Sequence, residues 1–319
     1  MALGEFELIE RYFTRPVRRA TLGIGDDCAL LAPQPGMQLC VSSDMLVEGR
    51  HFLATVAPQR LGHKALAVNL SDLAACGAEP LAFTLALALP RADEDFLAGF
   101  AAGLFALADR HGIELVGGDT TAGPLNICIT VFGQVPAGAA LLRSGARPGD
   151  ELWVSGTLGD ARAALECFRG SLSVDAAPFE RLRHAMEQPE PRVGLGQRLR
   201  GLASSAIDVS DGLLGDLGHI LRRSAVGARV DLAELPRSAD LAALPHALQN
   251  ECLLHGGDDY ELLFTAAPRQ HDAVRAAAQQ AGVAVSRIGH IEADRALVVV
   301  DADGRPLAVD GHGFDHFRR

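Results

Sequence analysis

Lysine is almost absent from this sequence, since Lys64 is the only one, so chemistry that needs a lysine has one candidate at most. The six cysteines are scattered, without a CxxC pair and without a cluster that also contains histidine. This spacing excludes an ordinary zinc site and a disulfide framework. It predicts cysteines that act as small buried hydrophobic residues in a reducing cytoplasm.

Long apolar runs are also lacking, because no uninterrupted stretch approaches the roughly 20 residues that span a bilayer. The early stretch GEFELIERYF is acidic and has neither the basic nor the apolar region of a secretory signal. Basic residues number 29 against 40 acidic ones, a formal charge of −11. Such a surface repels nucleic acid and anionic lipid, so we expect a cytoplasmic protein with no nucleic-acid or membrane partner.

The common nucleotide-binding and catalytic motifs are missing. There is no GxxxxGK[ST] loop and no HRD and DFG pair, which excludes the P-loop and protein-kinase patterns. The run GIGDD begins a dinucleotide fingerprint but lacks its third glycine and a following helix, so an NAD site is rejected. No Ser-His-Asp or Cys-His arrangement suggests a nucleophile or a general base.

The 319 residues, 48% of them hydrophobic, suit two domains of similar size. Helical and strand-like patterns alternate, which predicts a mixed α/β fold without a tandem repeat. The Gly- and Pro-rich run PAGAALLRSGARPGD is the expected junction, dividing the chain into domains 1–140 and 141–319. Strands expected in the first half are Cys28–Ala32, Gln38–Ser43, Leu81–Leu89, Ile113–Val116 and Asn126–Val135. Helices expected there are Glu5–Phe13, Arg60–Cys76 and Asp93–His111.

Aspartates recur next to glycine or at the end of an expected strand, in GIGDD, SSD, GGDTT, DVSDG and GGDDYE. Glycine lets a backbone approach a ligand closely, and carboxylates are hard oxygen ligands. Without histidine or cysteine nearby, the pattern favours Mg²⁺ or Mn²⁺ over Zn²⁺. One Gly-Asp pair is more often a simple turn or helix cap. Five such motifs across both halves predict a shared metal site in one pocket.

Asp72 strengthens this interpretation. It lies in HKALAVNLSDLAACG, an expected helix whose other residues are largely apolar. A carboxylate buried there is costly unless it is paired or binds a metal, and Lys64 is two turns away. Mg²⁺ held by carboxylates usually completes its shell with water and substrate phosphates. An acidic protein can therefore hold a polyphosphate through bridging Mg²⁺ ions.

Read in order, the motifs resemble those of the thiamine-monophosphate kinase family along essentially the whole chain. They are GIGDDCAL, SSDMLVEGRHF, HKALAVNLSDLAACGAEP, GGDTT, LLRSGARPGD, DVSDGL, GGDDYELLF and GFDHF. VEGRHF and NLSDLAACGAEP are specific to that family, whereas GGDTT and RSGARPGD are shared with the wider aminoimidazole-ribonucleotide-synthetase-like superfamily.

The resemblance implies a two-domain synthetase-like fold of the mixed α/β class. The N-terminal sheet would form a barrel-like interface in a homodimer, backed by helices, and the C-terminal α/β domain would complete a cleft that holds the active site. The implied substrates are ATP and thiamine monophosphate, with several Mg²⁺ ions as cofactors.

The resemblance also implies residue roles. Those implied to share Mg²⁺ are Asp27, Ser42, Ser43, Asp44, Asp72, Asp119, Asp208 and Asp211. Those implied to contact ATP are Gly118, Asp119, Arg143 and Ser210. Those implied to contact thiamine monophosphate are His51, Glu261 and Phe314.

Each implied contact also has an ordinary structural alternative. A lone histidine such as His51 more often has a structural role. Glu261 could be an ordinary carboxylate at a strand edge, and Arg143 could simply cap the domain junction. Phe314, in the polar run GHGFDHF, is equally a stray core contact or a platform for a thiazolium cation.

The implied acceptor is a phosphate monoester, which is largely ionised at pH 7 because its second pKa is about 6. We therefore expect direct in-line transfer without a general base or covalent intermediate. Two rivals stay open: another ATP-using enzyme of the same superfamily, and a non-catalytic nucleotide-binding maturation protein. A selenophosphate synthetase is disfavoured because TLGIGDDCAL contains no lysine.

Overall fold

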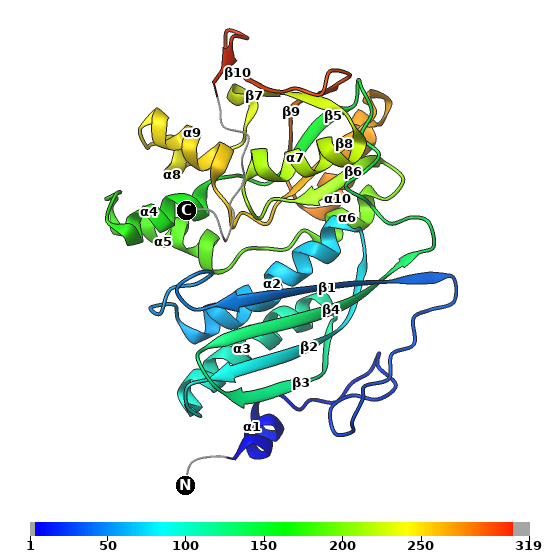
Figure 1. Ribbon diagram of the computed structural model, residues 1–319, viewed down its shortest axis with the longest axis vertical. Helices are drawn as coiled ribbons and strands as arrows, with labels where there is room; N and C mark the ends of the chain where they lie inside the picture. The colour runs from blue at the N-terminus through cyan, green and yellow to red at the C-terminus, as the bar shows by residue number, and fades with distance from the viewer. Residues whose placement is uncertain (1–3, 309–319) are drawn as a thin grey trace. The chain divides into compact units, whose positions relative to one another are not determined.

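The computed structural model describes residues 4–308, which form two compact units. Unit 1 contains residues 4–73 and 78–138, and unit 2 contains residues 74–77 and 139–308. Both combine helices with a sheet, so the mixed α/β prediction is confirmed (Figure 1). None of the helices in this described range has the length and apolar character that a bilayer crossing needs.

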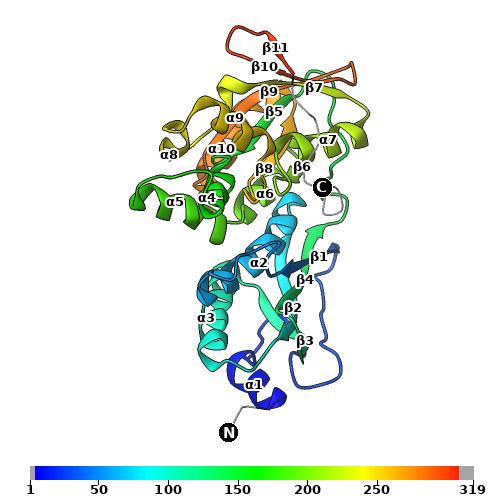
Figure 2. The same cartoon turned by 60° about the vertical axis from the view of Figure 1, so that its left-hand side comes forward.

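Unit 1 is a four-stranded sheet with strand order β1-β4-β2-β3. Strands β1, β4 and β2 are antiparallel neighbours, while β3 runs parallel to β2 after the crossover through α3. Helices α2 and α3 lie along one face of the sheet (Figure 2). The elements are α1 (Glu5–Tyr12), β1 (Met37–Val47), α2 (Pro58–Ala75), β2 (Glu79–Leu89), α3 (Glu94–His111), β3 (Glu114–Ala122) and β4 (Asn126–Pro136).

Two glycines allow α2 and α3 to pack closely. A Cβ on Gly62 would lie 2.0 Å from the Phe100 carbonyl oxygen, and one on Gly103 would lie 1.8 Å from that of Gln59. Asp93 caps the start of helix α3, and its carboxylate accepts a hydrogen bond from the Phe96 amide at 3.1 Å. This is the capping geometry expected for an aspartate at that position.

Unit 2 is a seven-stranded sheet with strand order β11-β10-β7-β9-β5-β8-β6. Its strands are β5 (Glu151–Ser155), β6 (Ala203–Asp208), β7 (Gly227–Asp231), β8 (Leu262–Ala266), β9 (Val285–Glu292), β10 (Leu297–Val300) and β11 (Pro306–Leu307). Its α-helices are α4 (Asp160–Arg169), α5 (Ala176–Glu187), α6 (Val193–Leu199), α7 (Leu213–Ser224), α8 (Ala239–Ala242), α9 (His246–His255) and α10 (His271–Ala281).

Helices cover both faces of this sheet. Leu152 and Val154 of β5 belong to the core cluster that includes α4, α7 and α9. Trp153, between them, points to the opposite face, where its ring lies 5.0 Å from that of His271 at the start of α10. Alternation along β5 therefore places one apolar layer on each side of the sheet.

Two expectations about local structure were wrong. The run Cys28–Ala32 is not a strand, because only an isolated bridge joins Leu22 to Leu30. The cysteines are not all buried: Cys252 is, whereas Cys28 is exposed and the others are half-buried. The four-stranded sheet of unit 1 is open within the chain, and the barrel-like interface expected between two chains stays a prediction.

Candidate functional site

Two of the three expected site residues on β1 face α2. Strand residues alternate between the two faces of a sheet, so Ser42 and Asp44 share the side that carries α2. Ser42 Oγ donates to Asp72 Oδ2 on α2 at 2.5 Å, and the Asp44 amide donates to Asn69 Oδ1 at 3.1 Å. The sequence predicted a largely buried Asp72 carboxylate without a good partner. This was wrong, because Asp72 is half-buried and accepts a hydrogen bond from the Ser42 hydroxyl.

Ser43 lies on the opposite face of the same strand. Its hydroxyl is 2.9 Å from that of Thr130 on β4 and 3.2 Å from the Ile129 carbonyl oxygen, to which it donates. The structure therefore brings Ser42, Asp44 and Asp72 together and points the Ser43 side chain away from them. Asp44 is also inside β1 rather than at its end, because the strand continues to Val47.

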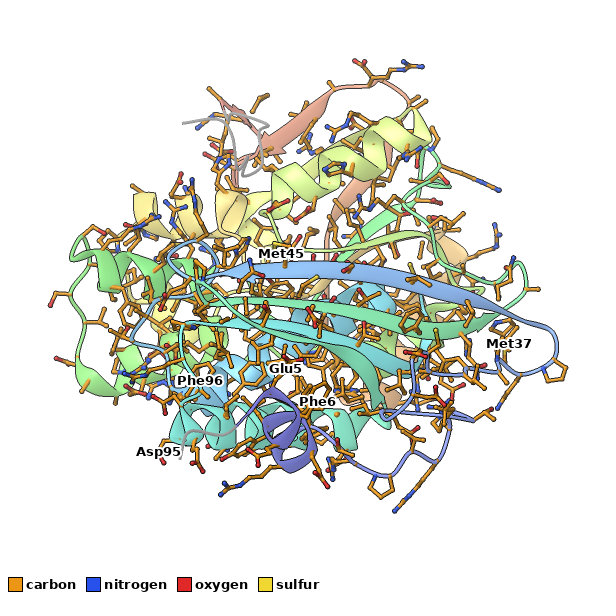
Figure 3. The ribbon with its side chains drawn as sticks, turned by 60° about the horizontal axis from the view of Figure 1, so that its bottom comes forward. Glu5, Phe6, Met37, Met45, Asp95 and Phe96 are labelled. Carbon is orange, nitrogen blue, oxygen red and sulfur yellow. The ribbon has the colours of Figure 1, made fainter. Side chains whose placement is uncertain are left out.

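A cavity of about 590 Å³ joins two of the acidic motifs of unit 1. The GIGDD loop contributes Asp26 and Asp27, and β3 contributes Gly118 and Asp119. All four are exposed. Apolar side chains line the rest, among them Phe6 of α1, which Figure 3 labels. This is an open pocket in which carboxylates and an apolar wall face the same space.

The geometry of β3 explains why glycine precedes Asp119. Gly118 has φ 149°, and a Cβ there would lie 1.9 Å from the Leu85 carbonyl oxygen of β2. Asp119 itself pairs with Ala86 of β2, so GGDTT is part of a strand and not the turn that its glycines suggest. The glycine is needed for strand pairing, and its role in ATP contact stays a prediction.

His51 has a structural contact. Its Nδ1 accepts a hydrogen bond from the Val47 amide at 3.0 Å, which ties the turn after β1 to the end of that strand. When the ring is neutral, its proton must then be on Nε2. The structural role is therefore present, and a contact with substrate stays a prediction.

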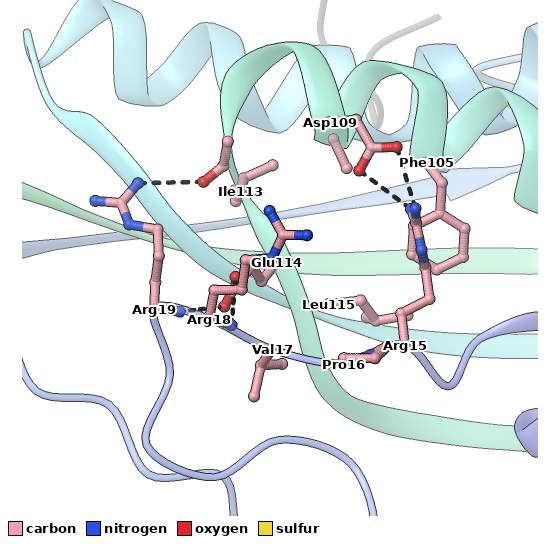
Figure 4. Close-up of a pocket in the computed structure, with 12 residues that line it drawn as sticks. Arg15, Pro16, Val17, Arg18, Arg19, Phe105, Asp109, Ile113, Glu114 and Leu115 are labelled. Atoms are coloured by element: carbon pink, nitrogen blue, oxygen red, sulfur yellow. Dashed lines mark hydrogen bonds and ion pairs between the residues drawn. The ribbon is translucent and has the colours of Figure 1, made fainter.

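A second cavity in unit 1, about 540 Å³, is lined by three arginines of the run RPVRR. Two of them are engaged: Arg15 binds both carboxylate oxygens of Asp109 at 3.2 Å, and Arg19 donates to the Gly112 carbonyl oxygen (Figure 4). Arg15 also lies over the Phe105 ring. These contacts tie the segment after α1 to α3, and the cavity contains none of the expected site residues.

In unit 2 the two acidic loops are joined by backbone hydrogen bonds. Asp208 is the last residue of β6, the loop after it contains Ser210 and Asp211, and Glu261 directly precedes β8. The Val209 amide donates to the Glu261 carbonyl oxygen at 2.8 Å. Two bonds run the other way, from Asp258 to Ser210 and from Tyr260 to Val209. The neighbouring strands β6 and β8 thus hold DVSDG and GGDDYE side by side.

The second loop contains strained backbone. Asp258 and Tyr260 have φ of 67° and 51°, a left-handed conformation that costs free energy in residues with a side chain. Tyr260 Oη donates to Asp258 Oδ1 at 3.0 Å, which closes the loop on itself. Strain of this kind persists only where the surrounding contacts over-determine the backbone.

Glu261 is buried inside an ion pair. It is 5% exposed, and both of its carboxylate oxygens accept from the guanidinium of Arg192. Ser155 Oγ donates to the same carboxylate and in turn accepts from the Leu262 amide. Sequence reasoning missed Arg192 and Ser155, and no local pattern could have indicated them because each is far from Glu261 in the chain. The expected balance between Glu261 and a substrate cation stays a prediction, and Arg192 already provides a counter-charge.

Asp216 is the other functional candidate that sequence reasoning missed. It lies on the first turns of α7, is 3% exposed, and accepts hydrogen bonds from the Ser210 and Asp211 amides, both at 3.0 Å. Burial raises the pKa of its carboxyl to about 7. A sequence signal existed, since acidic residues near the start of a helix often bind free amides there.

Arg143 lies on an exposed loop whose backbone is fixed by α7. The hydroxyl of Ser224 accepts from the Gly145 amide at 3.1 Å and from the Ala146 amide at 3.2 Å. Burial lowers the pKa of His219, and the neighbouring positive charges of Arg222 and Arg143 lower it further. Arg143 and Asp211 are thus both close enough to His219 to influence its charge.

The donors are suited to Mg²⁺ bound together with a ligand. Within residues 4–308 no three His, Cys, Asp or Glu side chains converge as a preformed ion site. The expected ligands are instead aspartate carboxylates and serine hydroxyls that occur singly or in pairs. Mg²⁺ typically takes one or two carboxylates and completes its shell with water and phosphate oxygens. Convergence of both units on one pocket stays a prediction, and Phe314 lies outside the described residues.

Comparison with known proteins gives a consistent result along the chain. Residues 25–135 match the family "AIR synthase related protein, N-terminal domain", and residues 147–302 match its C-terminal domain. The thiamine-monophosphate kinase of Salmonella typhimurium is 48% identical over 327 residues, covering 99% of each chain. The crystal structure of the thiamine-monophosphate kinase from Stenotrophomonas maltophilia K279a is 48% identical, with a TM-score of 0.87 over 96% of this chain and 99% of that one. The structure of AaThiL complexed with AMPPCP and TMP is 28% identical, with a TM-score of 0.76 over 90% and 89%.

Proposed function

Because the chain belongs to the thiamine-monophosphate kinase family of AIR synthase related proteins, we propose that it transfers the γ-phosphoryl group of ATP to thiamine monophosphate. The observation that carries this proposal is the match of 48% identity across 99% of the chain to a kinase of that name. The products are thiamine diphosphate and ADP.

Transfer is direct and in line. A phosphate oxygen of thiamine monophosphate forms the new bond to the γ-phosphorus, while the bond between that phosphorus and the bridging oxygen of ADP breaks. The acceptor oxygen is already largely ionised at pH 7, so no side chain has to remove a proton. What remains is to position two anions and to offset their charge.

Residues of both units would position the two substrates and offset their negative charge. Asp27, Asp44, Asp72 and Asp119 in unit 1, and Asp208 and Asp211 in unit 2, are the carboxylates that would hold Mg²⁺. When bound, Mg²⁺ supplies positive charge to the phosphate oxygens. Ser42 would share this role through the hydroxyl that now donates to Asp72, while Ser43 faces away from that pair. Arg143 provides a guanidinium fork for phosphate oxygens, and the Ser210 turn contacts the nucleotide.

Product analysis across a panel of monophosphates tests this function. The purified protein is incubated with ATP, Mg²⁺ and each acceptor, and products are separated by chromatography. We expect thiamine diphosphate and equimolar ADP with thiamine monophosphate, and little product with nucleoside or sugar phosphates. ATP binding without ADP release for any acceptor would overturn the proposal in favour of a non-catalytic nucleotide-binding protein.

Asp72→Asn tests the metal-binding part of the site. Asparagine can still accept from Ser42, so we expect the fold to persist while turnover and the response to Mg²⁺ collapse. The matched control is Asp109→Asn, which removes an exposed carboxylate of the same unit that pairs with Arg15. Wild-type turnover and Mg²⁺ dependence in Asp72→Asn would remove this residue from the site.

We also propose that unit 1 pairs with a second copy of the chain through the open face of its sheet. Leu39, Val41 and Met45 alternate along β1 and are 47%, 59% and 54% exposed. Figure 3 labels Met45 on this strand. They share the face opposite α2, and β1 is an edge strand of the sheet. An apolar strip on an edge strand is a liability unless another surface covers it.

Light scattering after size exclusion tests this pairing. We expect a dimer for the wild type and a monomer for Val41→Glu, because the new charge would be buried in the interface. Leu142→Glu, at a residue 57% exposed in unit 2, is the control that should leave the dimer intact. A wild-type protein that is monomeric at micromolar concentration would contradict the proposal.

A further inference from the structure

Asp216 accepts hydrogen bonds from the backbone amides of two expected ligand-binding residues. The carboxylate oxygen Oδ2 accepts from the Ser210 amide and from the Asp211 amide, each at 3.0 Å. Asp216 is on α7 and is 3% exposed, so its carboxylate is enclosed by protein. One buried oxygen therefore fixes two consecutive amides of the turn that precedes the helix.

The other side of the same turn is fixed by the GGDDYE loop. The Asp258 amide donates to the Ser210 carbonyl oxygen at 2.9 Å. Gly257 approaches this carbonyl so closely that a Cβ there would lie 2.5 Å from its oxygen. The peptide groups around Ser210 are thus held from both directions, with the amides bound by α7 and the carbonyl bound by the facing loop.

The choice of a carboxylate for this position has a physical reason. Two adjacent amides aimed into protein need an acceptor, since an unpaired buried N–H group is costly. A carboxyl group can accept both hydrogen bonds on one oxygen whether or not it is ionised. An apolar residue at 216 would fill the space but would leave both amides without a partner, and the turn would be free to move.

We propose that Asp216 is a positioning residue that sets the geometry of the Ser210–Asp211 turn for nucleotide and Mg²⁺ binding. This inference rests on the proposed function, because that function gives Ser210 and Asp211 their roles. Asp216 acts through the backbone and not by touching substrate. Its loss should therefore weaken saturation by ATP and Mg²⁺ in a way that loss of stability alone does not.

The test compares Asp216→Ala and Asp216→Asn with Glu187→Ala. Glu187 is a matched control because it is also a carboxylate 3% exposed in unit 2, bound to Arg183 on α5 and outside the expected site. Steady-state kinetics give kcat, the KM for ATP and the Mg²⁺ concentration for half-maximal rate, and thermal melting gives stability.

We expect Asp216→Ala to raise the KM for ATP or the Mg²⁺ requirement by about tenfold or more, the scale expected for the loss of two hydrogen bonds. Asp216→Asn retains an acceptor and should recover most of this loss. Glu187→Ala should lower the melting temperature and leave both saturation values unchanged. Wild-type saturation in Asp216→Ala, or equal loss in Asp216→Asn and Asp216→Ala, would overturn the proposal.

Two further measurements separate this inference from the proposed function and from a folding defect. Calorimetric titration of Mg²⁺ and AMPPCP, without an acceptor, reports on the turn even if thiamine monophosphate is not the substrate. Hydrogen exchange on the wild-type protein needs no variant: the Ser210 and Asp211 amides should exchange slowly. Exchange of both at the rate of surface-loop amides would contradict the role of Asp216 directly.

Discussion

Asp119 in unit 1 and Asp216 in unit 2 both follow glycine-containing runs, yet their carboxylates have different surroundings. Asp119 is exposed on β3 and faces an open cavity. Asp216 is enclosed and binds two amides of its own unit. The first carboxylate has its oxygen atoms directed at solvent or a ligand, whereas the second is used to shape a loop.

The same contrast extends to the rest of each unit. In unit 1, Asp26 and Asp27 are exposed like Asp119, on a loop that has only isolated bridges. In unit 2, the loops at Asp208 and Glu261 are joined by backbone hydrogen bonds and by the Arg192 ion pair. Unit 2 therefore has a rigid arrangement before ligand arrives, and unit 1 provides exposed charge whose geometry a ligand can complete. Removing the Arg192 ion pair of unit 2 should therefore cost stability, and removing an exposed carboxylate of unit 1 should cost activity.

The largest expected effect on stability is at Arg192. Arg192→Ala leaves the Glu261 carboxylate buried without its cation, and breaking a buried pair in this way costs roughly 3–5 kcal/mol of unfolding free energy. Urea unfolding measures the loss. Arg305→Ala, in an exposed pair with Asp303, is the control and should cost less than about 1 kcal/mol. Equal losses in the two variants would contradict the rigid character of unit 2.

The largest expected effect on activity alone is at Asp119. Asp119→Asn removes one exposed charge at the cavity, and loss of one group that stabilises phosphoryl charge typically lowers kcat by roughly 10²–10³. Because the side chain is exposed, its unfolding free energy should change by no more than about 0.5 kcal/mol. Kinetics and urea unfolding on the same sample check both halves of this expectation. A destabilised variant with normal kcat would reverse the comparison.

Periodicity in the sequence predicted the elements whose side chains are sorted by burial. The expected strand Leu81–Leu89 is β2, with two more residues at its start, and the expected helix Asp93–His111 is α3 preceded by its cap. Strand β7 and helix α9 were missed, since neither has a one-sided apolar pattern. Cys28–Ala32 is apolar but too exposed to pair as a strand.

The site was predictable only as a set of residue types. Glycine next to aspartate indicated hard oxygen donors. The structure pairs Ser42 with Asp72, and it places Asp27 and Asp119 in the lining of one cavity. The contacts that organise unit 2 were not predictable, because tertiary structure brings Arg192 to Glu261 across 69 positions. Local sequence patterns do not predict such a pairing.

The pH dependence of stability tests how far Asp216 is enclosed. Its pKa of about 7 in the folded protein lies above the ordinary value of 3.8. Between these values the folded state binds more protons than the unfolded state, so this group makes stability fall as pH rises from about 4 to about 7. A shift of about three pKa units corresponds to about 4 kcal/mol of stability across this range.

Thermal melting in EDTA from pH 5 to 8 measures this contribution of Asp216 to stability. The melting temperature of the wild type should fall with pH more steeply than that of Asp216→Asn, which cannot ionise at this position. Parallel curves for the two proteins would show that the carboxyl group is better solvated than its 3% exposure indicates.

The smallest expected effect concerns Asn69, the unit 1 counterpart of Asp216. It is 1% exposed and accepts from the Asp44 amide at 3.1 Å, as Asp216 accepts from amides in unit 2, but it is neutral. Asn69→Ala should cost about 1 kcal/mol of stability, the usual net value of one hydrogen bond.

Gln134→Ala, at another amide side chain 1% exposed in unit 1, is the matched control. If Asn69 also positions Asp44, only Asn69→Ala should raise the Mg²⁺ requirement, by a few-fold and less than Asp216→Ala. Identical Mg²⁺ curves for the two unit 1 variants would leave backbone positioning as a property of unit 2 alone.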